Sequence, residues 1–91
     1  MKIETKTSFD KMFAKLQKRD KEAVGRAIDK FIQNPFDATL RNHRLKGVYC
    51  GILGLSSINA GGDLRILFKE LSDGRYEVVC LMYVGSHSQL Y

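Results

Sequence analysis

Apolar residues recur along the first third of the chain at the spacing of amphipathic helices. Two segments, 9–16 and 21–33, each have an apolar face, formed by Phe9, Met12, Phe13 and Leu16 in the first and by Ala23, Val24, Ala27, Ile28, Phe31 and Ile32 in the second. Ser8 is the predicted N-cap of the first helix, and Asn34-Pro35 ends the second. Because only a short break separates the two segments, the pattern predicts a helical hairpin.

Strand-like segments flank this hairpin along the sequence. Four segments alternate in polarity or are rich in apolar and β-branched residues: 2–7, 48–59, 64–71 and 76–84. Turns that contain glycine, at 60–62 and 72–74, join the last three segments, which predicts antiparallel pairing. Gly51 and Gly54 predict a bulge or bend within 48–59. Simple alternation in the last strand predicts that one of its faces carries Tyr76, Val78, Cys80, Met82 and Val84.

The order strand, helix, helix, strand, strand, strand predicts an α+β fold. We expect one domain, residues 1–91, with the helical hairpin packed on one face of a twisted, mainly antiparallel four-stranded sheet. In the third strand, alternation places Arg65 and Lys69 on the face away from the helices. That second face is expected to be partly open, where a polyanion could lie. The stretches 36–47 and 85–91 are expected to be a linking segment and a polar tail.

The net charge of the chain indicates which kind of partner it favours. Fifteen Lys and Arg residues against ten Asp and Glu give a formal net charge of +5, which favours polyanions such as nucleic acid. No apolar run approaches the roughly 20 residues of a membrane span, and no signal peptide begins the chain, so we expect a cytoplasmic protein without a membrane partner. Cys50 and Cys80 lack the spacing of zinc ligands and are expected to be reduced, and we expect neither a metal nor a cofactor.

The two histidines, His43 and His87, are candidates for acid–base chemistry. Both lie among glycine and polar residues rather than on an apolar stripe, so each is either a functional residue or a surface histidine without a role. RNA cleavage without a metal needs a base for the 2′-OH and an acid for the leaving 5′-oxygen, and histidine titrates near neutrality. Arginine matches phosphate oxygens in geometry, which makes Arg65 a candidate phosphate ligand.

Several further residues could support such a site. Arg41, Arg44 and Lys46 flank His43 and could hold an RNA backbone. Asp63 could orient a base or simply belong to the glycine turn before it. Tyr91, and also Tyr83, could stack on bases, although an aromatic residue in a core or at a sheet edge is the ordinary alternative for Tyr83.

Taken together, these features resemble the RelE/ParE toxin superfamily and, within it, the YafQ-like RelE branch. The similarity begins with the FDK sequence at 9–11 and the helix pair. It continues with NHRLKG at 42–47, similar to an N-H-x-L-x-G segment, and with GDLRILFK at 62–69, similar to a D-x-R-x-x-Y strand. It ends with GSHSQLY at 85–91, similar to a G-x-H-x-x-L-Y terminus. The order and spacing of the segments, rather than any single one, carry the resemblance.

The resemblance implies a toxin of a type II toxin–antitoxin pair that cuts mRNA on the ribosome without a metal and leaves a 2′,3′-cyclic phosphate. By motif, His43 and His87 would be the acid and base residues, Asp63 would assist and Arg65 would hold phosphate. Arg41, Arg44, Lys46, Lys69 and Tyr91 would complete the RNA-binding set. The implied partners are a cognate antitoxin, mRNA on the ribosome and, for the toxin–antitoxin hetero-oligomer, operator DNA.

The chain departs from the pattern at several positions. Ser56 and Asn59 replace an arginine and a histidine of many relatives, Tyr83 replaces an arginine, and Phe68 replaces a tyrosine. These changes remove cationic groups from the implied site. Two alternatives therefore stay open beside the ribonuclease: a ParE-like inhibitor of DNA gyrase, against which the paired histidines argue, and an inactive relative that only binds its antitoxin.

Overall fold

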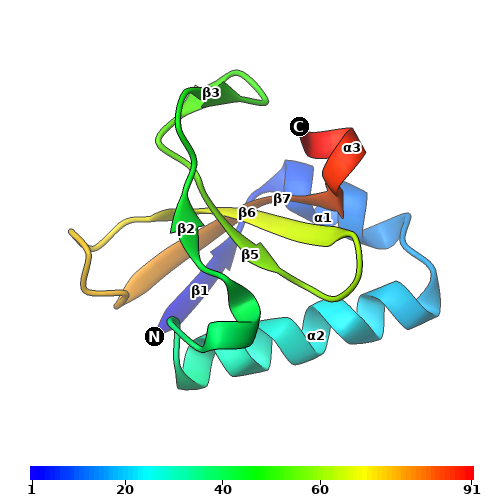
Figure 1. Ribbon diagram of the computed structural model, residues 1–91, viewed down its shortest axis with the longest axis horizontal. Helices are drawn as coiled ribbons and strands as arrows, with labels where there is room; N and C mark the ends of the chain where they lie inside the picture. The colour runs from blue at the N-terminus through cyan, green and yellow to red at the C-terminus, as the bar shows by residue number, and fades with distance from the viewer.

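The computed structural model describes all 91 residues and has the predicted α+β architecture (Figure 1). In chain order the elements are β1 (Lys2–Thr5), α1 (Thr7–Ala14), α2 (Lys18–Gln33), the 3₁₀ turn η1 (Ala38–Leu40), β2 (His43–Arg44), β3 (Val48–Tyr49), β4 (Ile52–Leu53), β5 (Ser56–Asn59), β6 (Leu64–Glu70), β7 (Val78–Ser86) and α3 (His87–Leu90). No helix is both long and apolar enough to cross a membrane.

The main sheet is mixed but mainly antiparallel, as predicted. Its strand order is β1-β7-β6-β5-β2, and only the edge strand β1 runs parallel to its neighbour β7. The sheet has one strand more than the four expected. This fifth strand is β2, which has two residues, lies in the predicted linking segment and pairs with β5 at the edge of the sheet. A parallel pair needs a long crossover connection, and here the helical hairpin is part of the connection that returns the chain beside β1.

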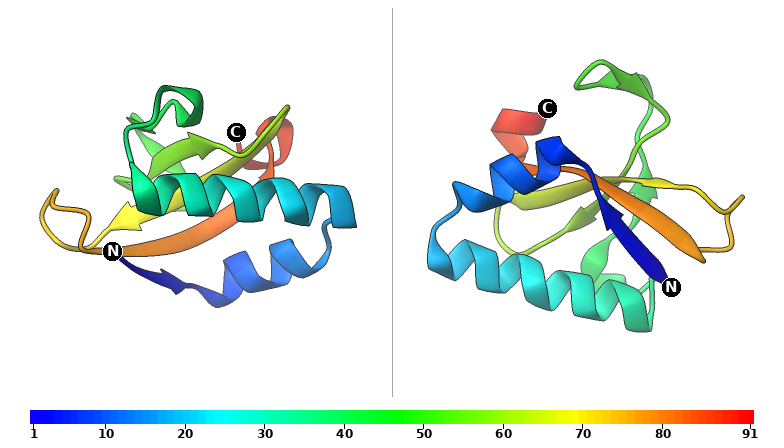
Figure 2. Two further views of the ribbon diagram at one scale, coloured as in Figure 1. Left: turned by 90° about the horizontal axis from the view of Figure 1, so that it is seen from below. Right: turned by 180° about the vertical axis from the view of Figure 1, so that it is seen from behind.

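Both helices bury their apolar faces on the same side of the sheet, which confirms the predicted layering (Figure 2). Phe9 of α1 and Val24, Ala27 and Phe31 of α2 join one core with residues of β5, β6 and β7. Phe31 is fully buried and meets Phe68 edge to face, with 5.0 Å between ring centroids. Each such side chain contributes about 1.5–3 kcal/mol by leaving water, so this core is the main source of stability.

The second face of the sheet is less open than the sequence analysis predicted. A smaller core covers its centre, and it consists of Leu45, Leu55, Leu67, Met82 and Leu90. The cover comes from the β3–β4 ribbon and from α3, which stand together on the side away from α2 (Figure 1). The segment 48–59 is therefore not one bent strand. Left-handed φ values at Cys50, Gly51 and Gly54 fold it into the ribbon, and only its last residues form β5.

The predicted facing of β7 is also wrong. Val79 and Leu81 lie in the helix-side core, whereas Met82 lies in the second core and Cys80 packs against it. Leu67 lies opposite Tyr83 and Phe68 lies opposite Leu81, so Met82 has no partner and is an extra residue in β7. Because of this bulge, Val84 returns to the helix side. A bulge of this kind interrupts the two-residue period on which the prediction rested.

Ser8 lies inside α1 and is not its N-cap, because the helix begins at Thr7. The Ser8 hydroxyl donates a hydrogen bond of 2.6 Å to the backbone carbonyl of Met82, the extra residue of the bulge. The side chain therefore ties α1 to the central strand at the point where the strand is irregular.

Ser8→Ala should lower the free energy of unfolding by about 1–2 kcal/mol, because a part-buried carbonyl loses its partner. Thr7→Ala, a neighbouring change with no such hydrogen bond, should stay within about 0.5 kcal/mol of the parent. Urea unfolding followed by circular dichroism measures both. Equal stability of the two variants would contradict the role given to Ser8.

The connection between β6 and β7, residues 71–77, is organised by one carboxylate. Glu70 accepts hydrogen bonds from the Ser72 hydroxyl and from the backbone N–H groups of Ser72, Gly74 and Tyr76. These bonds, that of the Ser72 side chain foremost, lower the pKa of Glu70 below its ordinary value. They also hold Tyr76 at a φ of 55°, a left-handed conformation that costs energy for a non-glycine residue.

The hydrogen bonds of Glu70 predict a specific dependence of stability on pH. A carboxyl whose pKa is lowered by folding stabilises the fold above its ordinary pKa, and loses that effect as the pH falls through the lowered value. Glu70→Gln should therefore lower Tm at pH 7, and the gap from the parent should shrink as the pH falls below 4.5, the ordinary value. Calorimetry at several pH values measures this gap. Glu77→Gln removes one charge nearby without these bonds and should shift Tm much less, and a gap that is constant down to pH 3 would refute the explanation.

Candidate functional site

Tyr91 joins residues of distant segments on the second face of the sheet. Its hydroxyl donates a hydrogen bond of 2.6 Å to Oγ of Ser57, a fully buried residue of β5. The ring of His87 meets the ring of Tyr91 edge to face at 4.4 Å between centroids, and Tyr49 of the ribbon approaches from another side at 5.2 Å. Ser57 and Tyr49 were not among the predicted site residues. Neither has a local sequence signal, because their role depends on this long-range packing.

His43 lies next to this group through strand pairing. It is directly opposite Ser57 in the β2–β5 pair, and side chains at such positions point to the same face with Cβ atoms about 4.5–5.5 Å apart. Its Nδ1 lies 2.7 Å from the carbonyl oxygen of Arg41. Because a carbonyl can only accept, Nδ1 carries the proton, and Nε2 of the neutral ring keeps a free lone pair. Arg41 ends η1 in the left-handed conformation, with φ 48°, which directs its carbonyl towards the ring.

His87 is held at the start of α3. Its backbone N–H donates to the carbonyl of Asp63 at 2.9 Å, and this bond ties the terminal helix to the turn between β5 and β6. The helix begins with a capping box, in which the Ser86 and Gln89 side chains bond each other's backbone N–H groups. The sequence analysis described 85–91 only as a polar tail, although the spacing of Ser86 and Gln89 is a recognisable start signal for a helix.

Asp63 and Arg65 lie at the same turn but make different contacts. Asp63 lines a cavity beside α2 together with Arg19 and Arg26, and its backbone carbonyl is the group that accepts from His87. The Arg65 guanidinium donates to the carbonyls of Gly62 and Leu64 at 3.0 and 2.9 Å. It is therefore folded back over the turn.

The remaining predicted basic residues are spread over both faces. Arg44 lies opposite Ser56 in the strand pair, on the face away from His43, and its guanidinium packs so close to Gly54 that a Cβ there would lie 3.3 Å from it. Lys69 is exposed at the far end of β6, and Lys46 is exposed before the ribbon. The structure thus joins Ser57 to Tyr91 by a hydrogen bond and Tyr91 to His87 by a ring contact, and it places His43 opposite Ser57 in the strand pair.

A second feature adjoins His43 at the end of the sheet. A cavity of about 540 Å³, hereafter the β2 cavity, lies between the segment after α2 and the 71–77 loop. Six of the residues that line it are Phe36, Asn42, His43, Arg44, Lys69 and Tyr76. Phe36 and Tyr76 were not predicted as site residues, because Phe36 stands alone in the linking segment and the alternation of 76–84 marked Tyr76 only as a strand residue.

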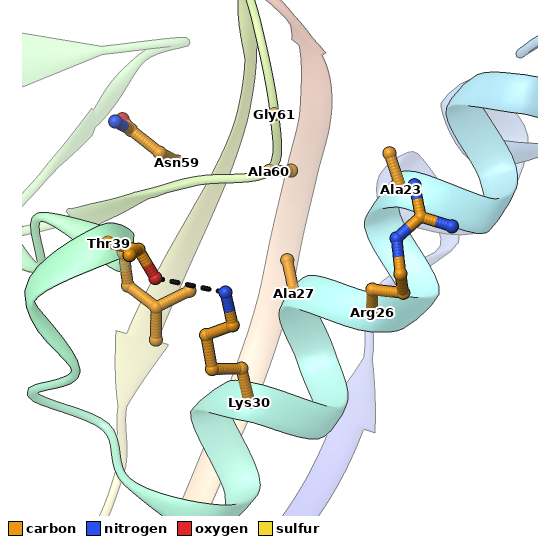
Figure 3. Close-up of a pocket in the computed structure, with 9 residues that line it drawn as sticks. Ala23, Arg26, Ala27, Lys30, Thr39, Asn59, Ala60 and Gly61 are labelled. Carbon is orange, nitrogen blue, oxygen red and sulfur yellow. Dashed lines mark hydrogen bonds between the residues drawn. The ribbon is translucent and has the colours of Figure 1, made fainter.

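Another cavity, of about 270 Å³, lies between α2 and the end of β5 (Figure 3). Its floor includes Ala23 and Ala27 of α2 and Ala60 after β5, and Lys30 reaches across to donate to Oγ1 of Thr39 at 3.0 Å (Figure 3). Neither a histidine nor a carboxylate lines this cavity, so it offers no side chain for acid–base chemistry.

The cysteines and acidic residues do not form an obvious reactive centre. Burial raises the pKa of the Cys50 thiol and, with a contribution from the charge of Glu4, that of the Cys80 thiol. Both thiols therefore remain protonated and weakly nucleophilic at neutral pH. No group of three or more His, Cys, Asp and Glu side chains is arranged to hold a metal ion.

Comparison with known proteins identifies the fold. No protein-family profile and no curated protein sequence matches the chain. Among solved structures, YafQ from E. coli strain BL21(DE3) matches with a TM-score of 0.73 and 22% identity over 96% of this chain and 93% of its own. RelE from the archaeal RelE–RelB complex of Pyrococcus horikoshii OT3 matches with 0.71 and 16%, over 97% and 96% of the two chains. The YoeB/ParE toxin from Agrobacterium tumefaciens matches with 0.72 and 18%, over 96% and 99%. Over nearly its whole length, the chain therefore has the fold of the RelE/ParE toxins, in the form seen in YafQ.

Proposed function

We propose that this protein is the toxin of a toxin–antitoxin pair and an endoribonuclease that cuts mRNA on the ribosome. The observation that carries the proposal is the placement of His43 and His87, which lie 44 positions apart in the sequence, on one face of the sheet, where His43 lies opposite Ser57 and His87 packs on Tyr91. Paired histidines supply the base and the acid that cleavage through the 2′-OH requires, without a step that depends on a metal. The fold shared with YafQ and RelE supports the same assignment.

His43 is the better candidate for the base. Its Nδ1–H is held by the Arg41 carbonyl, so Nε2 is free to take the 2′-OH proton, and the same carbonyl stabilises the imidazolium that forms. The 2′-oxygen then attacks phosphorus, and the bond from phosphorus to the 5′-oxygen breaks. In this proposal His87, with its ring positioned against Tyr91, gives its proton to the 5′-oxygen, which leaves a 2′,3′-cyclic phosphate and a 5′-OH.

The cations take supporting roles in this proposal. Arg65 would release its two carbonyl partners to contact the scissile phosphate, and Asp63 would act through its backbone by holding His87. Lys69, Arg44 and the exposed Arg41 and Lys46 would bind the flanking RNA backbone, in keeping with the net charge of +5.

A protein partner is part of the same proposal. Solved structures similar to this chain include toxins in complex with antitoxins, such as the E. coli DinJ–YafQ complex and the archaeal RelE–RelB complex. We propose that a cognate antitoxin binds this chain and that the hetero-oligomer binds operator DNA. An enzyme that cuts mRNA on ribosomes would act in the cytoplasm.

An inactive, antitoxin-binding relative is the second candidate. Two of the departures from the family pattern, Asn59 and Tyr83, lie on the same face as the histidines, where they replace cationic groups. Arg65 is bound to carbonyls in the free protein. In contrast, Ser56 lies opposite Phe68 and points towards the helix side, so its loss of charge leaves the histidine face unchanged. No observation favours the gyrase inhibitor.

His43→Gln and His87→Gln should each reduce mRNA cleavage by about 10²–10⁴-fold, the usual worth of one acid or base. The assay is primer extension on mRNA from translating ribosomes incubated with purified protein. Arg26 lines the cavity between α2 and the end of β5. Arg26→Gln is the matched control and should cleave like the parent. Parent-like cleavage by both histidine variants would exclude the acid–base mechanism, and intact mRNA with the parent protein would favour the inactive relative.

The hydrogen bond between Tyr91 and Ser57 should matter for the rate because it positions the ring against which His87 packs. Tyr91→Phe and Ser57→Ala should each lower kcat by about tenfold, the equivalent of about 1.4 kcal/mol. Because both remove the same bond, the double variant should be no slower than either single one. Additive losses in single-turnover cleavage would show that the two residues act separately.

A further inference from the structure

An aromatic side chain at the rim of the β2 cavity is left open to solvent. Phe36 is 66% exposed, although its ring is braced edge to face by Tyr76 at 5.2 Å between centroids. Tyr76 is itself fixed by contacts with the buried rings of Phe31 and Phe68 at 5.8 and 6.2 Å. A held aromatic ring with a free face is a suitable platform for a flat ligand.

Polar groups with unused hydrogen-bonding capacity lie beside this ring. The Asn42 side-chain amide donates to the carbonyl of Pro35 and to the hydroxyl oxygen of Tyr76. Oδ1 of Asn42 remains free to accept, and the hydroxyl proton of Tyr76 remains free to be donated. One donor and one acceptor side by side are what the edge of a nucleobase can pair with.

The cavity is lined by charged residues of both signs. Arg44 and Lys69 line it together with His43, and the carboxylates of Glu70 and Asp73 line it towards the 71–77 loop. A phosphate would be attracted to the first group and repelled by the second. A neutral base with amino groups suits the acidic side, since Asp73 can accept hydrogen bonds from such groups. The volume of about 540 Å³ lies within the range of roughly 300–1,000 Å³ that is usual for small-ligand sites.

We propose that the β2 cavity binds one nucleobase of the RNA, stacked on Phe36, with the attached phosphate against Arg44 and Lys69. This inference rests on the proposed function, since it takes RNA as the ligand. His43 lines both the cavity and the face that carries Tyr91, so the base held in the cavity belongs to a nucleotide adjacent to the one that is cut. The cavity would then contribute to the choice of cleavage position along the RNA.

The test uses a fluorescein-labelled, fully 2′-O-methylated RNA of about 12 nucleotides, which has no 2′-OH and cannot be cleaved. Binding by the parent protein, Phe36→Ala and Phe36→Trp is followed by fluorescence anisotropy at low salt. Ile32→Ala is the matched control, because Ile32 is an apolar residue that is 43% exposed close by in the chain and does not line the cavity. An abasic oligonucleotide of the same length separates base stacking from attraction to phosphate.

Phe36→Ala should weaken binding of the RNA about tenfold, which corresponds to about 1.4 kcal/mol and is within the usual worth of one base–aromatic stack. Phe36→Trp and Ile32→Ala should bind like the parent, and the abasic strand should not distinguish Phe36→Ala from the parent. Equal affinity of the parent and Phe36→Ala for the RNA would overturn the nucleobase assignment. It would indicate instead that the exposed ring of Phe36 contacts a protein partner. Absence of any RNA binding by the parent would also overturn the nucleobase assignment. Neither result bears on mRNA cleavage on ribosomes, which is a separate test of the proposed function.

Discussion

The pairing of β6 with β7 is the constraint on which the rest of the structure depends. These are the two longest strands, and both present apolar side chains to both faces of the sheet. Ile66 and Phe68 require cover on one side, and Leu67 and Met82 require it on the other. The two helices supply the first cover. Short segments supply the second cover, namely the β3–β4 ribbon and α3.

This need for a second cover explains where the candidate site forms. Leu45, Leu55 and Leu90 are buried on the second face, and two of them, Leu45 and Leu90, adjoin residues of the candidate site in the sequence. Leu90 positions Tyr91, and its helix begins at His87. Leu45 follows the short strand β2, whose pairing with β5 sets His43 opposite Ser57. The two histidines therefore lie on the same face of the sheet because the apolar residues next to them must leave water.

Much of the fold could be predicted from local patterns. The helices have strong apolar periodicity, the glycine turns are distinct, and their order limits the architecture to a few choices. The shorter elements could not be predicted, because β2, β3 and β4 have two residues each and exist only through pairing. The bulge at Met82 has no local signal, and it places Val84 on the opposite face from Cys80 and Met82, which were predicted to share its face. The capping box of Ser86 and Gln89 is the one available signal that the sequence analysis missed.

The residues of the candidate site could also be predicted only in part. Histidines are rare enough in this chain that both could be named from residue chemistry and from motif resemblance. Ser57, Tyr49 and Phe36 belong to residue types that are common in any sheet or loop, and only tertiary contacts mark them. The orientation of Arg65 also depends on the turn geometry, because its guanidinium bonds two local carbonyls.

The central claim is that His43 and His87 form one site for RNA. Long-range ¹H–¹⁵N correlation spectra of the histidine rings, recorded with and without an uncleavable 2′-O-methyl RNA, test it most directly. We expect the neutral ring of His43 to carry its proton on Nδ1, and the RNA to shift the ring signals of both histidines at the same concentration. A proton on Nε2 of neutral His43, or signals of only one histidine shifted at saturating RNA, would contradict it.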